Sequence, residues 1–187
     1  MSNRSSVRIA LCVLVLSWKA FAFETAVNEH SKRIADFEAH VAAYLKLHQK
    51  ALAGLPRSKP TNSPEEITRR QSELAAKVRA LRPKAKQGEI FTPEISAEFH
   101  RLVSISWQGR DAVRMKASLR SSEPVRIALH INGEYPDQVP LQSTPPTLLQ
   151  NLPALPKELE YRIVNHALVL RDVAANLIVD FTDSFIP

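Results

Sequence analysis

The chain has almost no cysteine and little glycine: Cys12 is its only cysteine, and four glycines are spread over 187 residues. Cys12 lies in an apolar N-terminal stretch. Leu11 before it is larger than the small residue that precedes a lipidated cysteine, so we do not expect Cys12 to be lipidated. Removal of that stretch leaves no thiol, which excludes disulfides, thiolate catalysis and cysteine-ligated metals. The sequence also contains no glycine-rich loop that would hold nucleotide phosphates and no G-x-S-x-G serine motif.

The N-terminal stretch has the three parts of a secretory signal peptide. Arg4 and Arg8 precede any acidic residue, an apolar run covers residues 9–18, and residues 20–22 are a small-x-small cleavage sequence, Ala-Phe-Ala. The run is about half of the roughly 20 residues that a membrane-spanning helix needs, so a permanent anchor is the less favoured alternative. We therefore expect a cysteine-free mature chain of residues 23–187, no transmembrane segment after cleavage, and a periplasmic or secreted location.

The expected mature chain is less basic than the whole sequence. The formal net charge is +6, and cleavage removes Arg4, Arg8 and Lys19 without any acid, which leaves +3. The remaining charge is divided unevenly, because residues 23–123 are net basic and residues 124–187 are net acidic. A net charge of this size suits solubility and by itself requires neither nucleic acid nor a membrane as partner.

The first part of the mature chain has the apolar periodicity of amphipathic helices. Gly54 is a helix stop, and Ser63-Pro64 with Glu66 is a capping sequence that starts the next helix. Thr92-Pro93 repeats that start signal. We predict antiparallel helices at residues 28–52 and 63–82, a third helix from residue 93, and a further helical piece at 110–119.

Beyond Pro124 the apolar period changes to two, as in half-buried strands. Turn signals follow at Asn132-Gly133, Asn165-His166 and residues 174–176, and a proline-rich stretch covers residues 135–156. We predict strands at residues 125–131, 159–164, 167–172 and 177–181, and one short helix at 144–149.

These patterns predict an α+β fold in which N-terminal antiparallel helices, about three, precede a small, mostly antiparallel C-terminal β-sheet. Residues 1–22 are the signal peptide, residues 23–123 a helical lobe and residues 124–187 a β-rich lobe. We expect the two lobes to form one compact domain. The alternation within the strands places Leu168 and Leu170 on the face toward the core.

The C-terminal residues carry a resemblance to known proteins. The runs at residues 155–164, 168–172 and 176–180, together with residues 88–93, resemble an uncharacterised family of exported bacterial proteins. The shorter stretch at 161–179 is similar to the β-hairpin tail of the periplasmic nickel/cobalt-homeostasis protein family. The resemblance implies a bacterial envelope protein, and it transfers no catalytic residue.

Six histidines raise the question of a metal site. His40 and His48 are eight residues apart on a predicted helix, which separates them by about 12 Å along its axis, too far to share one ion. The other four are scattered along the chain without an H-x-x-x-H pair: His30, His100, His130 and His166. We therefore expect no bound metal and no cofactor.

Acid–base chemistry would need side chains that converge in the β-rich lobe. That lobe contains the candidates Asp172, Asp180, Asp183, His130 and His166. Asp172 and Asp180 stand at strand ends, where carboxylates usually cap turns or face water. We assign no catalytic residue and keep, as the alternative function, a hydrolytic enzyme with its site between the helical lobe and the sheet.

The second predicted helix and its tail are strongly basic, with Glu73 as the single acid between residues 69 and 86. The basic residues are Arg69, Arg70, Lys77, Arg79, Arg82, Lys84 and Lys86. Such a run is either a solvated helix face or a contact for an anionic envelope component, such as a phospholipid headgroup or polysaccharide, or for an acidic protein surface. Nucleic acid is not expected, because aromatic residues for base stacking are missing here. The function most consistent with the sequence is a non-enzymatic binding or interaction module, of undetermined oligomeric state.

Overall fold

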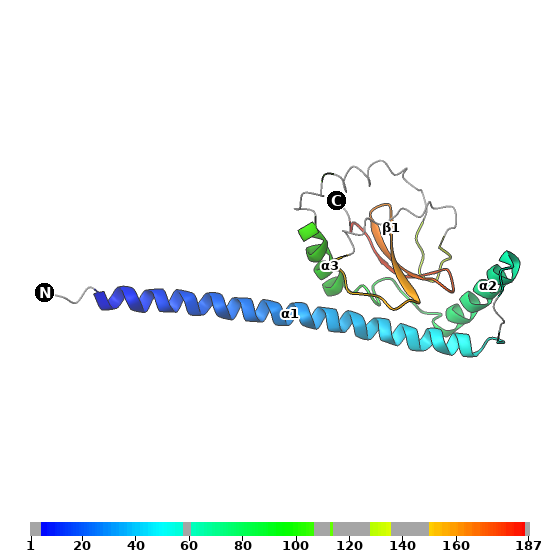
Figure 1. Ribbon diagram of the computed structural model, residues 1–187, viewed down its shortest axis with the longest axis horizontal. Helices are drawn as coiled ribbons and strands as arrows, with labels where there is room; N and C mark the ends of the chain where they lie inside the picture. The colour runs from blue at the N-terminus through cyan, green and yellow to red at the C-terminus, as the bar shows by residue number, and fades with distance from the viewer. Residues whose placement is uncertain (1–4, 58–60, 107–112, 114–127, 136–149, 186–187) are drawn as a thin grey trace.

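The computed structural model describes residues 5–57, 61–106, 113, 128–135 and 150–185, with backbone only for residues 5–27. Its elements follow the order α1 (Ser5–Ala53), α2 (Pro64–Leu81), α3 (Pro93–Ser106), β1 (Leu159–Val164), β2 (Ala167–Asp172) and β3 (Leu177–Thr182). Helices precede an antiparallel sheet, so the predicted α+β class is confirmed (Figure 1). The helices predicted at 110–119, apart from Val113, and at 144–149 lie outside the described residues.

Helix α1 is about twice as long as the predicted helix of residues 28–52. It covers 49 residues from Ser5, and its N-terminal part extends beyond the rest of the chain (Figure 1). Among its described side chains, from residue 28 on, the buried apolar ones begin at Phe37, so the periodicity of the sequence marks the packed part of this stretch. Among the described residues, none of the helices combines the length and the apolar character needed to cross a membrane.

Helix α2 starts as its capping sequence predicts. The Ser63 hydroxyl accepts a hydrogen bond from the Glu66 N–H, and Pro64 occupies the first turn, where no N–H is needed. The Ser63 hydroxyl donates to Glu65 Oε2 at 2.6 Å. The Ser63 N–H, which a capping box would pair with the Glu66 carboxylate, donates to Thr61 Oγ1 at 3.2 Å. The helix ends before Arg82, whose N–H still bonds to the Val78 carbonyl.

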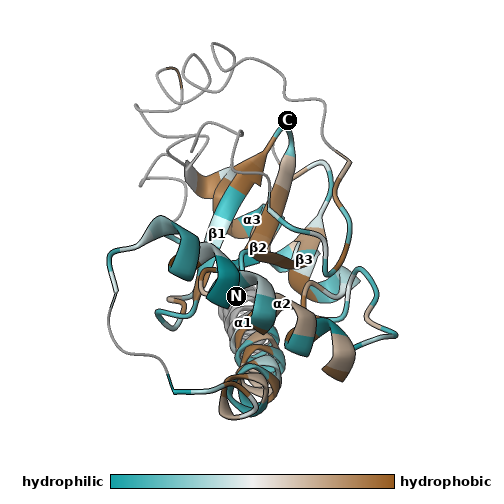
Figure 2. Ribbon diagram, turned by 90° about the vertical axis from the view of Figure 1, so that its right-hand side faces the viewer, coloured by the Kyte–Doolittle hydropathy of each residue, from teal (hydrophilic) through white to brown (hydrophobic). Residues whose placement is uncertain are grey.

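The three strands form an antiparallel sheet in the order β1-β2-β3. Asn165 and Asn176 adopt positive φ angles of 55° and 49° at the two turns, a conformation that asparagine accepts more readily than most residues. The predicted tight hairpin at Asn165-His166 and the turn before β3 are therefore confirmed. Figure 2 shows the three strands side by side above α1, which is viewed nearly along its axis.

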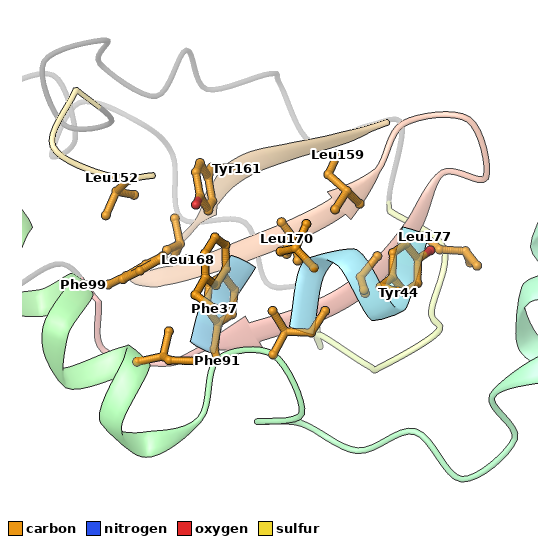
Figure 3. Packing of buried hydrophobic residues seen from close by; sticks show 14 of the residues in the cluster. Phe37, Tyr44, Phe91, Phe99, Leu152, Leu159, Tyr161, Leu168, Leu170 and Leu177 are labelled. Atoms are coloured by element: carbon orange, nitrogen blue, oxygen red, sulfur yellow. The ribbon is translucent and has the colours of Figure 1, made fainter. Parts of the chain in front are cut away.

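The core lies between the helices and one face of the sheet. Leu168 and Leu170 are fully buried there, as their alternation predicts. They pack in one cluster with Phe37 and Phe99, whose ring centroids are 4.9 Å apart, and with Tyr161 (Figure 3). Aromatic pairs at this distance add to the stabilisation from burial. Residues of the helices and of the strands thus share one hydrophobic cluster.

The opposite face of the sheet is covered by the segment at residues 128–135, part of which was predicted to be a strand. Residues 128–131 form no strand, so the described part of the prediction for 125–131 is wrong. The chain turns at Asn132, with φ 60°, and pairs with β3 through one bridge between Glu134 and Leu177. Tyr135 then packs on the outer face with Val169 and others. Because the chain turns at Asn132, residues 128–131 do not continue this pairing as a β-ladder with β3.

Candidate functional site

A groove of about 730 Å³ lies between the C-terminal end of α1, helix α2 and the turn that joins β2 to β3. Leu52 lies on α1, Ile67 and Leu74 on α2, and Val173 and Ala174 on the turn. Segments more than 100 residues apart in the sequence therefore meet at one surface, and their contact depends on the packing of the whole domain.

Part of the apolar lining of this groove is exposed. Ile67 is 51% exposed and Val173 is 40% exposed, so two of the large apolar side chains that the described surface leaves open lie in this groove. Leu74 follows Ile67 by seven residues, about two helical turns, so it lies on the same face of α2. Its side chain is buried. Exposed apolar side chains that gather in a concave surface are typical of a binding site.

Three arginines line the same groove: Arg57, Arg69 and Arg70. Two carboxylates, Glu66 and Glu73, also line it, which leaves a charge of +1 over the described lining residues. The Arg69 guanidinium is 3.9 Å from the Glu73 carboxylate, an exposed pair that contributes little to stability. Nη1 of Arg70 donates to the Pro56 carbonyl at 2.9 Å and fixes the chain after α1 against α2.

The seven basic residues singled out in the sequence do not share one surface. Arg69 and Arg70 line the groove, whereas Arg79 Nε donates to the Asn132 carbonyl at 2.9 Å. The Arg82 side chain is only 9% exposed and donates to the Val179 carbonyl at 3.1 Å. The remaining three are exposed: Lys77, Lys84 and Lys86. Arg82 therefore belongs to the packing between α2 and β3, which the sequence run did not reveal.

A buried polar cluster joins α1 to the end of β2. Asp172 Oδ2 accepts a hydrogen bond from the Tyr44 hydroxyl at 2.7 Å and lies 2.5 Å from Nδ1 of His48. Asp172 Oδ1 accepts from the Ala175 N–H at 2.8 Å. Asp172 and His48 are at most 1% exposed. Asp172 thus caps the β2–β3 turn, as expected of a strand-end carboxylate, but it does not face water.

The titration of this cluster follows from its contacts. The hydrogen bond to Asp172 raises the pKa of His48 above its usual range, against the opposing effect of burial. Burial, followed by the charge of Asp172, raises the pKa of Tyr44, so the phenol keeps its proton. The cluster therefore holds two donors on one carboxylate oxygen, an arrangement that fixes α1 against the sheet.

Asp180 on β3 satisfies backbone donors of the segment before α3. Its Oδ1 accepts from the Gly88 N–H at 2.9 Å, and Oδ2 accepts from the N–H groups of Ile90 and Phe91 at 2.7 and 2.8 Å. Asp180 is fully buried, so the sequence-based alternative that it faces water is wrong. It caps a loop distant in sequence.

The five residues of the hydrolase alternative do not converge on one cavity within the described parts of the chain. Asp172 and Asp180 are buried against different segments. His166 and Asp183 line a separate hollow of about 410 Å³ beside the β1–β2 turn. His130 is exposed and lies outside that lining.

A second charged cluster lies near the middle of α1. The Glu98 carboxylate on α3 is 2.6 Å from Nδ1 of His30 and 3.2 Å from Nη1 of Arg33, and it also pairs with Arg101. The hydrogen bonds from Arg101, followed by those from His30 and Arg33, lower the pKa of Glu98 to about 2, although burial acts in the opposite direction. This cluster fastens α3 to α1.

The Glu98 cluster predicts a loss of stability in acid. Because the folded state lowers the Glu98 pKa to about 2 from an unfolded value of about 4.5, its contribution is complete above pH 4.5 and disappears as the pH falls toward 2. Glu98→Gln should therefore lower the free energy of unfolding at pH 7 and flatten its decline between pH 4.5 and 2, as followed by urea denaturation. An unchanged acid profile in Glu98→Gln would contradict this assignment.

The histidines are distributed over separate environments. His30 contacts Glu98, His48 contacts Asp172, and the His100 ring lies 5.2 Å from the Phe185 ring, centroid to centroid. In the described residues, no three histidine, cysteine or carboxylate side chains come together as potential ligands of one metal ion.

No protein family matches this sequence, and neither curated proteins nor solved structures show a significant match to it. The resemblance to exported bacterial proteins that residues 88–93 and 155–180 suggest therefore stays a prediction.

Proposed function

We propose that this chain is an exported, non-enzymatic binding module of the bacterial envelope, and that the groove between α1, α2 and the β2–β3 turn binds its anionic partner. The observation that carries the proposal is the meeting of exposed apolar side chains and three arginines in one concave surface. Such a combination attracts an anion and offers apolar contact at the same place.

The geometry of α1 is compatible with loss of the signal peptide. The described contacts between α1 and the rest of the chain begin at His30, and its buried core residues begin at Phe37. Cleavage after Ala22 would therefore remove none of the described residues of the core or the groove. We expect the protein produced with its native N-terminus to start at Phe23 when its mass is measured after export. Recovery of an intact chain that starts at Met1, held in the membrane fraction, would contradict export by cleavage.

The hydrolytic alternative has one observation in its favour. The Tyr44–His48–Asp172 cluster lies between the helical part and the sheet, where that alternative places its site. A general base must reach a substrate proton, and His48 is 1% exposed in this conformation. The groove, in contrast, is open, and we therefore favour binding over hydrolysis.

Binding at the groove can be tested with 8-anilinonaphthalene-1-sulfonate, a dye that is both anionic and apolar and fluoresces in apolar surroundings. We expect saturable binding of one dye per chain that weakens at least threefold in Arg69→Glu, because Arg69 lines the groove. Lys84→Glu is the matched control, since Lys84 is exposed and lies outside the lining. Equal dye affinity in the two variants and the parent would contradict the groove as the anion site.

A further inference from the structure

We propose that the natural ligand of the groove is a single-chain carboxylate amphiphile, of the chemical class of fatty acids. This inference rests on the proposed function, since it names the ligand of the same groove. It assigns the acyl chain to the apolar strip of Leu52, Ile67 and Val173, which lies beside the buried Leu74, and the carboxylate to the three arginines of the lining.

The apolar strip suits a hydrocarbon chain better than a sugar. Ile67 and Leu74 are seven residues apart on one face of α2, and Val173 faces them from the turn of the sheet. The described lining contains no aromatic side chain on which a sugar ring could stack. A volume of about 730 Å³ lies within the range of about 300–1,000 Å³ that is usual for sites of small ligands.

The arginines suit a carboxylate. Arg57, Arg69 and Arg70 come from two segments, and a guanidinium binds a carboxylate through two parallel N–H donors. Arg69 is 70% exposed and its contact with Glu73 is loose, at 3.9 Å, so its guanidinium can turn toward a ligand at little cost.

The acidic residues of the same groove argue for a ligand with one negative charge. Glu66 and Glu73 line it together with the arginines. An acidic peptide or a polyanionic polysaccharide would bring several carboxylates near these two and be repelled, since like charges brought together oppose binding. A fatty acid carries one carboxylate, which the three guanidinium groups can neutralise.

The proposal can be tested by displacement of 8-anilinonaphthalene-1-sulfonate with octanoate, decanoate and dodecanoate below their micelle concentrations. Each added methylene should strengthen binding by up to about fourfold, the equivalent of about 0.8 kcal/mol per buried CH₂. Dodecyltrimethylammonium, which has the same chain and the opposite charge, should compete at least tenfold more weakly than dodecanoate. Affinity that does not increase with chain length, or equal competition by the cationic amphiphile, would overturn the proposal.

Variants locate the two ends of the ligand. Ile67→Ser should weaken dodecanoate at least threefold, whereas Ile105→Ser, at a residue of similar exposure (53%) outside the groove, should not. Arg69→Gln should weaken dodecanoate and leave dodecanol unchanged, with Lys84→Gln as control.

Three outcomes show whether this proposal fails alone or together with the proposed function. If the dye binds at the groove but dodecanoate does not displace it, the fatty-acid assignment is overturned and the binding function stands. If neither the dye nor dodecanoate binds, both are overturned. Displacement of the dye by a synthetic glutamate-rich peptide at lower concentration than dodecanoate would also overturn the fatty-acid assignment, in favour of an acidic protein partner.

Discussion

Replacing Asp172 with alanine is expected to lower the free energy of unfolding by about 3–5 kcal/mol, the cost of removing one partner from a buried pair. The change leaves the Tyr44 hydroxyl, His48 Nδ1 and the Ala175 N–H without their shared carboxylate. Because these donors come from α1 and from the β2–β3 turn, the loss would loosen the helix from the sheet. Urea denaturation monitored by circular dichroism at pH 7 measures the effect.

Asp36→Ala is the matched control for this experiment, because Asp36 is an exposed aspartate on α1. An ordinary surface substitution of this kind should change the free energy of unfolding by no more than about 0.5 kcal/mol. If Asp172→Ala cost as little as Asp36→Ala, the buried cluster would not hold α1 to the sheet.

Asp180→Ala is expected to cost at least about 3 kcal/mol. The N–H groups of Gly88, Ile90 and Phe91 would lose their acceptor, and each buried donor left unsatisfied costs about 1–3 kcal/mol. The segment that leads into α3 should then become mobile, which amide hydrogen exchange at residues 88–91 would register as a loss of protection.

Asp183→Ala provides the comparison for Asp180. Asp183 follows β3, is exposed, and accepts one hydrogen bond from the Gln87 side chain. We expect its replacement to leave both the stability and the exchange at residues 88–91 close to those of the parent. Retained protection at residues 88–91 in Asp180→Ala would contradict the role assigned to its carboxylate.

Much of the fold could be predicted because its signals are local. Apolar residues three or four apart mark the buried face of α1 from Phe37 onward, and short apolar runs between turn residues mark the strands, of which β2 and β3 are buried on both faces. Asn165 and Asn176 stand at the positive φ angles of the two turns. These features depend on a few neighbouring residues, so they can be recognised without knowledge of the tertiary structure.

The strand predicted at 125–131 is wrong over its described part because alternation alone does not supply a pairing partner. Residues 128–131 alternate, yet the chain turns at Asn132 and pairs with β3 only after them, through backbone hydrogen bonds of Asn132 and Gly133 to Ile178 and the bridge at Glu134. The same pattern arises wherever a loop lays alternate side chains on a buried surface. Here that surface is the outer face of the sheet, covered by Tyr135.

The groove and the buried polar clusters could not be predicted because they join distant segments. His48 and Asp172 are 124 residues apart, and Ile67 and Val173 meet only once the domain has folded. A partial signal was present for the first pair: His48 continues the apolar stripe of α1, and Asp172 is a strand-end carboxylate. A histidine on a buried stripe needs a polar partner, but its identity depends on topology.

The most direct test of the binding site is to map, by two-dimensional NMR, which backbone amides of the purified protein shift when 8-anilinonaphthalene-1-sulfonate is added. We expect the largest shifts around Leu52, along residues 67–74 of α2 and at residues 173–174, where the lining of the groove lies. Shifts centred instead on the hollow beside His166 and Asp183, or spread evenly over the surface, would contradict the claim that this groove is the binding site.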